Sequence, residues 1–350
     1  MPDEQERRQI FYWLQKVSSL TAWRHIFTLY QAWADATENS LRVADETGRA
    51  TTTALPHSEY ALILKCLAHC EEGVLRLAQG DKRVFKFDAH GEFVMAQRML
   101  SHWSEMTDRI AIGETRVNPD TPLWDQFTGA LDALARAWGE CGPYILEGRF
   151  VEDPAPIFYG EPLLSQWRSM WFPPALAAVP DPAQNTFVRT GQATPCSGIW
   201  EPIDAANGGA TSLLSMFTRT PAPQPPFQIV SAMSYLHGES NAPQVAVETA
   251  DDIVNVDTTW RLLWRDDRYQ DGSVPAIEAT YRFVEPQAVR EVHADVAADD
   301  GVVWAESGDL ASIAGKWLVE SDLNAAVTLQ QGEPLPLHEG RAVRWVLAEK

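Results

Sequence analysis

The chain has 350 residues, 45% of them hydrophobic and 22% charged, and its 48 acidic and 28 basic side chains give a formal net charge of -20. This length allows two domains that each bury a core, and the composition is that of a folded protein. Because an acidic surface repels nucleic acid and anionic lipid, direct binding to either is disfavoured and a basic protein partner is favoured. Solubility alone would explain the same charge.

The N-terminus and the cysteines bear on the compartment. Residues 1–8 lack the basic and apolar regions of a signal peptide, and no segment approaches the roughly 18 uninterrupted apolar residues of a membrane span. The four cysteines are too few and too scattered for a disulfide scaffold. We therefore expect a cytoplasmic protein with reduced thiols that does not associate with membranes.

The first half of the chain, up to about residue 172, has apolar residues at three- and four-residue spacing, which predicts helices. Asp3 and Thr21 are predicted to cap the first two helices, and Gly80 is predicted to end the third. The pattern indicates a helical bundle. The predicted helices cover residues 3–19, 21–48, 58–80, 92–110, 122–142 and 161–171.

Beyond a Pro- and Ala-rich linker at 173–184, strand-length runs alternate with turn residues. This predicts an α+β protein with segregated halves: a helical domain at 1–178 and an antiparallel β-rich domain at 186–350. A helix is also expected near 287–296. The predicted strands cover residues 227–233, 244–247, 258–264, 276–284, 301–304, 316–319, 325–329 and 341–347.

A Gly-x-Trp element occurs twice in the β-rich half. The segment 197–204 recurs loosely at 314–322, and each copy precedes a strand-like run that carries another tryptophan. The repeat predicts two related units, at about 186–285 and 300–350. We expect the glycine to permit a tight backbone and the tryptophan to fill the core. The first copy is longer between its tryptophans, and this extra length is where we expect the partner to bind.

Two segments resemble metal sites. Cys66, His69 and Cys70 invite a zinc interpretation, but both cysteines lie on the apolar stripe of a predicted helix, which favours buried structural thiols. Residues 267–278 partly match a calcium loop, with Asp267 first and Glu278 twelfth. However, Tyr269 stands where a short oxygen ligand is expected, and a polar turn explains the same residues. We expect no metal.

Sequence motifs for catalysis are weak. The chain lacks the Gly-x-Ser-x-Gly elbow, the His-Glu-x-x-His zinc helix and a phosphate-binding glycine loop. Adjacent carboxylates such as 251–252, 266–267 and 299–300 are typical of solvated turns. We therefore expect neither an enzyme nor a bound cofactor.

The segment 189–200, Arg-Thr-Gly-Gln-Ala-Thr-Pro-Cys-Ser-Gly-Ile-Trp, resembles a Thr-Gly-x-x-x-Pro-x-Ser-Gly-x-Trp element of immunity proteins from bacterial polymorphic-toxin and type VI secretion systems. The run 7–13, Arg-Arg-Gln-Ile-Phe-Tyr-Trp, is similar to the start of the same proteins. The families are immunity protein 71 and immunity protein 72. The resemblance implies an antitoxin that neutralises a cognate toxin by tight binding, with occlusion of the toxin's active site or substrate groove.

Acidic loops and nearby tryptophans of the β-rich half are the predicted partner contacts, because complementary charge accelerates association and aromatic anchors dominate interfaces. The residues are Asp251, Asp252, Asp266, Asp267 and Asp271, with Trp260 or Trp264 as the anchor. The alternative for the tryptophans is the β core. Rival functions are an enzyme that reverses toxin damage and a scaffold or carbohydrate-binding module. Apolar, Trp-rich helical faces also allow a homodimer.

Overall fold

The computed structural model divides the chain into two compact units, residues 1–287 and residues 288–350. The structure describes residues 2–148, 159–160, 163–164, 167, 170–204, 223–248, 252–283, 304–309, 311, 313–319, 322–338 and 343–349. Helices up to residue 145 precede antiparallel sheets, so the α+β class expected from the sequence is confirmed.

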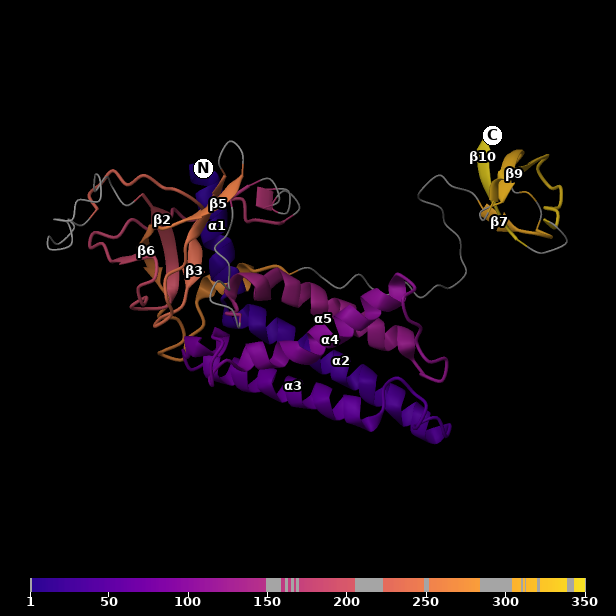
Figure 1. The fold of residues 1–350 in the computed structure, drawn as a ribbon, viewed down its shortest axis with the longest axis horizontal. Coiled ribbons are helices and arrows are strands. Elements are labelled where there is room, and N and C mark those ends of the chain that lie inside the picture. Colours follow the sequence, from indigo (N-terminus) through magenta and orange to yellow (C-terminus); the bar gives the residue numbers. More distant parts are fainter. Residues whose placement is uncertain are drawn as a thin grey trace. The chain divides into compact units, whose positions relative to one another are not determined.

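The helices of the first unit follow the predicted periodicity closely. In Figure 1, α2 to α5 lie side by side in an elongated bundle, and α1 lies beside the strands. A short 3-10 helix, η1, links α3 to the loop before α4. The elements are α1 (Glu4–Val17), α2 (Leu20–Glu46), α3 (His57–Leu77), η1 (Lys82–Phe85), α4 (Glu92–Ala111) and α5 (Trp124–Ile145). Of the helix expected at 161–171, Leu163, Leu164 and Trp167 are helical, and most of the rest lies outside the described residues.

The caps of the first two helices differ in how well the sequence identified them. Asp3 forms the capping box of α1, accepting from Glu6 N at 2.8 Å while its own N–H donates to the Glu6 carboxylate at 2.7 Å. The prediction that Thr21 caps α2 is wrong. Ser19 is the cap, because its hydroxyl accepts from Ala22 N at 3.1 Å and the helix begins at Leu20. The two helices are therefore separated by a corner of only two residues, 18 and 19.

Aromatic side chains fill the bundle core. Trp23 stacks on Phe93 with ring centroids 4.0 Å apart and meets Trp138 edge-on at 5.3 Å. A Cβ at Gly73 would lie 2.6 Å from the Phe93 ring, so the glycine is what lets α3 approach α4 here. The Trp-rich helical faces are therefore buried inside the bundle by this tight packing.

The first unit also contains a four-stranded sheet in the order β1-β6-β2-β3 and a separate hairpin, β4–β5. Its strands are β1 (Phe187–Arg189), β2 (Gly198–Ile203), β3 (Ser234–Leu236), β4 (Val245–Glu248), β5 (Ile253–Val256) and β6 (Thr259–Arg265). Two predicted strands are wrong. The segment 276–284 contains the 3-10 helix η3 (Ala276–Thr280), and the segment 227–233 is not a strand but leads into β3, which begins at Ser234. The helix expected at 287–296 lies outside the described residues.

The second unit contains one described sheet in the order β7-β10-β8-β9. Its strands are β7 (Trp304–Glu306), β8 (Gly315–Val319), β9 (Asp322–Leu329) and β10 (Arg344–Glu349). Both four-stranded sheets are antiparallel and have the same strand order. If the strands of each sheet are counted along the chain, the order across the sheet is first, last, second, third. Two connections differ: 30 residues join β2 to β3 where two join β8 to β9, and the β4–β5 hairpin is inserted before β6.

The Gly-x-Trp elements begin the central strands β2 and β8. Trp200 and Trp317 are fully buried, and each belongs to the hydrophobic cluster of its own sheet. Because β2 has two covered faces, Trp200 packs into the cluster of the sheet, whereas Ile199 packs into the cluster of the helices. Neither tryptophan offers a ring face to solvent, so the carbohydrate-binding alternative has no exposed stacking surface at these positions.

Candidate partner-binding surface

The first sheet is fixed to the helices by a buried ion pair between α1 and β2. Glu201 is buried, and its carboxylate accepts from Arg7 Nε at 2.9 Å and pairs with Nη2 at 2.8 Å. Burial raises the pKa of Glu201, and the positive charge of Arg7 opposes this shift. The pair holds α1 to one face of the sheet.

A second attachment lies at the corner between α1 and α2. The guanidinium of Arg268 donates to the carbonyls of Gln15, at 2.8 Å, and Ser18, at 3.1 Å, which belong to the C-terminal end of α1. The carboxylate of Glu278 accepts from Thr21 N at 3.1 Å, at the start of α2. A cation thus meets the C-terminal end of one helix and an anion meets the N-terminal end of the next. The segment after β6 is thereby held on the bundle.

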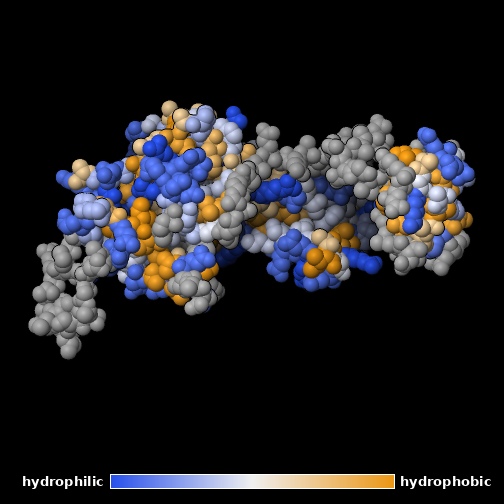
Figure 2. Space-filling model, turned by 90° about the horizontal axis from the view of Figure 1, so that it is seen from above, coloured by the Kyte–Doolittle hydropathy of each residue, from blue (hydrophilic) through white to orange (hydrophobic). Residues whose placement is uncertain are grey.

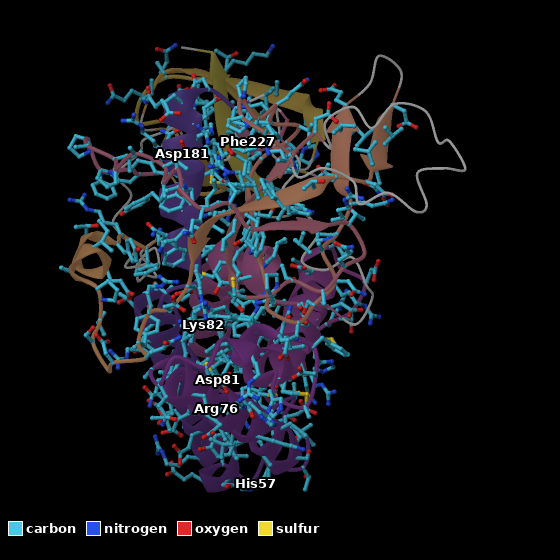
Figure 3. All side chains as sticks on the ribbon, turned by 90° about the vertical axis from the view of Figure 1, so that its left-hand side faces the viewer. His57, Arg76, Asp81, Lys82, Asp181 and Phe227 are labelled. Atoms are coloured by element: carbon cyan, nitrogen blue, oxygen red, sulfur yellow. The ribbon has the colours of Figure 1, made fainter. Side chains whose placement is uncertain are left out.

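Asp266 belongs to this buried polar cluster. Its carboxylate pairs with Arg268 at 2.7 Å and Lys82 at 3.5 Å, and it accepts from the Tyr235 hydroxyl at 2.8 Å. Burial alone would raise the pKa of Asp266, but Arg268 and Lys82 hold it below its usual value. Burial lowers the pKa of Lys82 to about 8 against the opposing charge of Asp266. In Figure 3, Lys82 lies toward the strands, whereas His57 marks the opposite end of the bundle.

The two predicted anchor tryptophans are engaged within the chain. Trp260 is fully buried, and its indole N–H donates to the Pro243 carbonyl at 2.8 Å. Trp264 is partly buried, meeting Phe11 edge-on at 6.3 Å with the Arg268 guanidinium 4.9 Å from its ring centroid. Trp260 and Asp266 therefore have almost no surface to offer a partner. Trp260 thus lies in the β core, which was the alternative given above for the tryptophans.

Other predicted contacts lie in an exposed loop after β6. Asp267 pairs with Arg265 at 2.8 Å. Asp271 accepts from the N–H of Ser273 at 2.9 Å and its hydroxyl at 2.7 Å, and these hydrogen bonds lower the pKa of Asp271. The loop presents carboxylates to solvent in a conformation held by its own residues.

Asp252 is exposed between the two strands of the β4–β5 hairpin, directly before β5, and accepts from Ile253 N at 2.8 Å, while Asp251 lies outside the described residues. The hairpin precedes β6, and the acidic loop follows it. The two regions therefore lie at opposite ends of β6, a strand of 7 residues that is roughly 20 Å long. The structure thus places the predicted carboxylates in two separate acidic regions.

Two exposed apolar side chains beside Asp252 were not predicted from the sequence. Ile253 and Val254 are 53% and 37% exposed, although β-branched residues in a strand are usually covered. Val254 lies on the face that anchors the hairpin, where Val245 is buried and Val256 packs against the sheet cluster, and Ile253 lies on the opposite face. Two consecutive apolar residues directly after paired aspartates were the available signal. On the face shown in Figure 2, hydrophobic and hydrophilic residues are interspersed.

The residues considered for metal binding are used elsewhere in the structure. Cys66 and Cys70 lie in the bundle core, where burial raises the pKa of the Cys70 thiol, and His69 Nδ1 lies 2.7 Å from the Glu92 carboxylate. Glu278 is bound to the start of α2. Within the described residues, no three His, Cys, Asp or Glu side chains are grouped so that they could hold an ion.

These features define an α+β protein in which a helical bundle carries a β sheet and exposes two acidic regions. Residues 1–156 match the family model of Immunity protein 71, and residues 180–282 match that of Immunity protein 72. The chain belongs to the immunity proteins of this family type, as the sequence resemblance implied. Immunity protein families are generally non-enzymatic, and membership indicates toxin neutralisation with a cognate toxin as partner. No curated protein and no solved structure matches the chain.

Among the described helices, none combines the length and apolar character needed to cross a membrane.

Proposed function

We propose that this chain neutralises its cognate toxin by tight binding that occludes the toxin's active or substrate site. The observation that carries the proposal is the match of both the helical part and the first sheet to immunity protein families. The internal pairing of the polar residues supports a binder, because the buried carboxylates Asp266 and Glu278 already serve the fold. They leave the exposed acidic regions as the chemistry available to a partner.

The partner is a basic protein in this proposal. Charge supports it: the chain has a formal net charge of -20, and the hairpin and the loop after β6 both expose aspartates. Complementary charge raises association rates, so a basic toxin would be captured quickly. The encounter takes place in the cytoplasm, and the toxin is one delivered by a polymorphic-toxin or type VI secretion system.

The test begins with a toxin whose gene lies next to that of the chain and whose growth inhibition is relieved by co-expression of the chain. The purified chain is titrated against this toxin, with toxin activity as the readout. We expect inhibition to be complete at about one chain per toxin molecule, because occlusion consumes the inhibitor. Protection by much less than one equivalent would contradict occlusion and favour the rival enzyme that reverses damage. Retained toxin activity with excess chain would contradict neutralisation altogether.

A homodimer remains part of the proposal, with a different basis than the sequence suggested. The Trp-rich helical faces are buried inside the bundle, so the apolar surface left on the helices includes Leu62, Leu64 and Leu75 of α3. Sedimentation equilibrium of the chain and of its Leu62→Glu, Leu75→Glu variant checks this part. A monomer mass for the unaltered chain at micromolar concentration would contradict it.

A further inference from the structure

The two four-stranded sheets correspond residue by residue at the end of their first strands. Thr190 N donates to Thr258 O at 3.0 Å, and Ser307 N donates to Val343 O at 2.9 Å. In the reverse direction, the hydroxyl of Thr190 accepts from Thr258 N at 2.9 Å and that of Ser307 accepts from Val343 N at 3.0 Å. The same side-chain and backbone exchange therefore closes both sheets.

The correspondence continues through a glycine and a tryptophan. Gly191 and Gly308 both have positive φ, 80° and 99°, and donate to Ala242 O and Leu335 O, each at 2.8 Å. The next residues along are prolines, Pro243 and Pro336. Their carbonyls accept from the indole N–H groups of Trp260, at 2.8 Å, and Trp345, at 3.1 Å. These contacts align Pro243 with Pro336 and Thr258 with Val343.

This alignment isolates the β4–β5 hairpin as extra chain. Between the aligned positions the first unit has residues 244–257, whereas the second has only residues 337–342. The same frame is thus closed in the second unit by a much shorter connection. Neither the sheet order nor the buried tryptophan bond requires the hairpin, so its exposed residues are not explained by the fold.

The hairpin has the surface of a strand acceptor. Among the described strands, β4 and β5 pair only with each other, so their outer edges carry no further strand. Exposed edges are usually protected by lysine, proline or a bulge, but the β5 sequence Ile-Val-Asn-Val has none of the first two and its pairing with β4 is regular. Between residues 242 and 257 the sequence has four acidic residues and no lysine or arginine.

We propose that the β4–β5 hairpin receives an extended, basic segment of the toxin by strand addition. Main-chain groups of the segment would pair with an open edge, its apolar side chains would cover Ile253 and Val254, and its lysines or arginines would meet the carboxylates of the hairpin. The proposal rests on the proposed function and names the part of the surface that performs it. The acidic loop after β6 is then a region of solvation.

The test compares two pairs of substitutions of like chemistry in the full-length chain. Ile253→Lys with Val254→Lys places two cations on the hairpin, where they would repel a basic strand and protect the edge. The control is Val274→Lys with Ile277→Lys, since these side chains are 43% and 44% exposed on the segment after β6. Affinity for the toxin encoded beside the gene, carried in catalytically inactive form, is measured by calorimetry. Circular dichroism and thermal unfolding show that each variant is folded.

We expect the hairpin pair to weaken binding at least tenfold and the control pair to bind as the unaltered chain does. Hydrogen exchange of the complex should show new protection of the amides of 253–256. Equal affinity of the hairpin variant, or a loss confined to the control pair, would overturn strand addition at the hairpin while neutralisation stands. Failure of the unaltered chain to bind the toxin would instead overturn the proposed function.

Discussion

The two sheets have one frame but different surroundings. At corresponding positions of the central strand, the first sheet has Ile199 and Glu201, which face the helices, whereas the second has Lys316, which is exposed, and Leu318, which is partly buried. The buried Trp200 and Trp317 are the same in both. The two sheets therefore share a central Gly-x-Trp strand and a first strand whose end is bound through a hydroxyl group. The residues that alternate with the tryptophan along the central strand decide what packs on the other face of the sheet.

The largest expected effect comes from the shared tryptophans. Replacing either with alanine removes a fully buried ring, which costs about 4 kcal/mol. The C-terminal unit spans residues 288–350, and a segment of this size has about 3 to 9 kcal/mol of total stability. Trp317→Ala should therefore remove a large share of the stability of its unit, whereas Trp200→Ala should remove a smaller share of the stability of the larger unit.

Hydrogen exchange of the amides in β2 and β8 measures both tryptophan variants in the intact chain. Each substitution should lower protection in its own sheet and leave the other sheet unchanged. A coupled loss of protection in both sheets after one substitution would show that the two units do not fold independently.

The buried ion cluster of Asp266, Arg268 and Lys82 belongs to the first unit. Arg268→Met should lower the stability of the first unit by about 3 kcal/mol, because it leaves the charge of Asp266 buried without its main partner. Arg265→Met is the control, since Arg265 is exposed and its pair with Asp267 is worth less than about 1 kcal/mol. Urea unfolding with protection of β6 as the readout gives both values. Equal effects of the two substitutions would contradict the role assigned to the cluster.

Lys82 gives this cluster a pH dependence with a definite sign. Its pKa is about 8 in the folded chain and near 10.4 in an unfolded one, so the unfolded state binds more protons between these values. Stability of the first unit should therefore rise by on the order of 2 kcal/mol from Lys82 as the pH increases from 8 to 10.4. Urea unfolding of Lys82→Met across this range should lack the rise, and Lys65→Met, at an exposed position of α3, should retain it. An identical pH profile in both variants would contradict the assignment.

The smallest effect tests the equivalence of the two sheet edges. Thr190→Val and Ser307→Ala each remove a hydroxyl that accepts from a backbone N–H of the last strand, at a cost of about 1 kcal/mol. Unfolding of each unit, followed by exchange of its own strands, should give similar losses. If the two losses of unfolding free energy differ by more than about 1 kcal/mol, the matching hydrogen bonds do not stabilise the two units equally.

The helices were the part of the fold that local sequence predicted well. The period of apolar residues located α1 to α5, and the Asp3 capping box follows from two residues three positions apart. Strand predictions were weaker, because strands depend on partners far away in sequence. The alternating segment that begins at Ala276 forms a 3-10 helix instead of a strand, and in this conformation the Glu278 carboxylate accepts a hydrogen bond from the start of α2.

The candidate site shows the same division. Sequence by itself determined that the chain is acidic, that its α and β parts are segregated and that it belongs to an immunity protein family. It could not tell Asp266 from Asp267, because adjacent residues of like chemistry are separated only by the direction in which the fold turns them. The tertiary structure buries one beside Arg268 and exposes the other. It also isolates the β4–β5 hairpin by aligning two sheets whose shared hydrogen bonds join residues of different types, Thr190 and Ser307 among them.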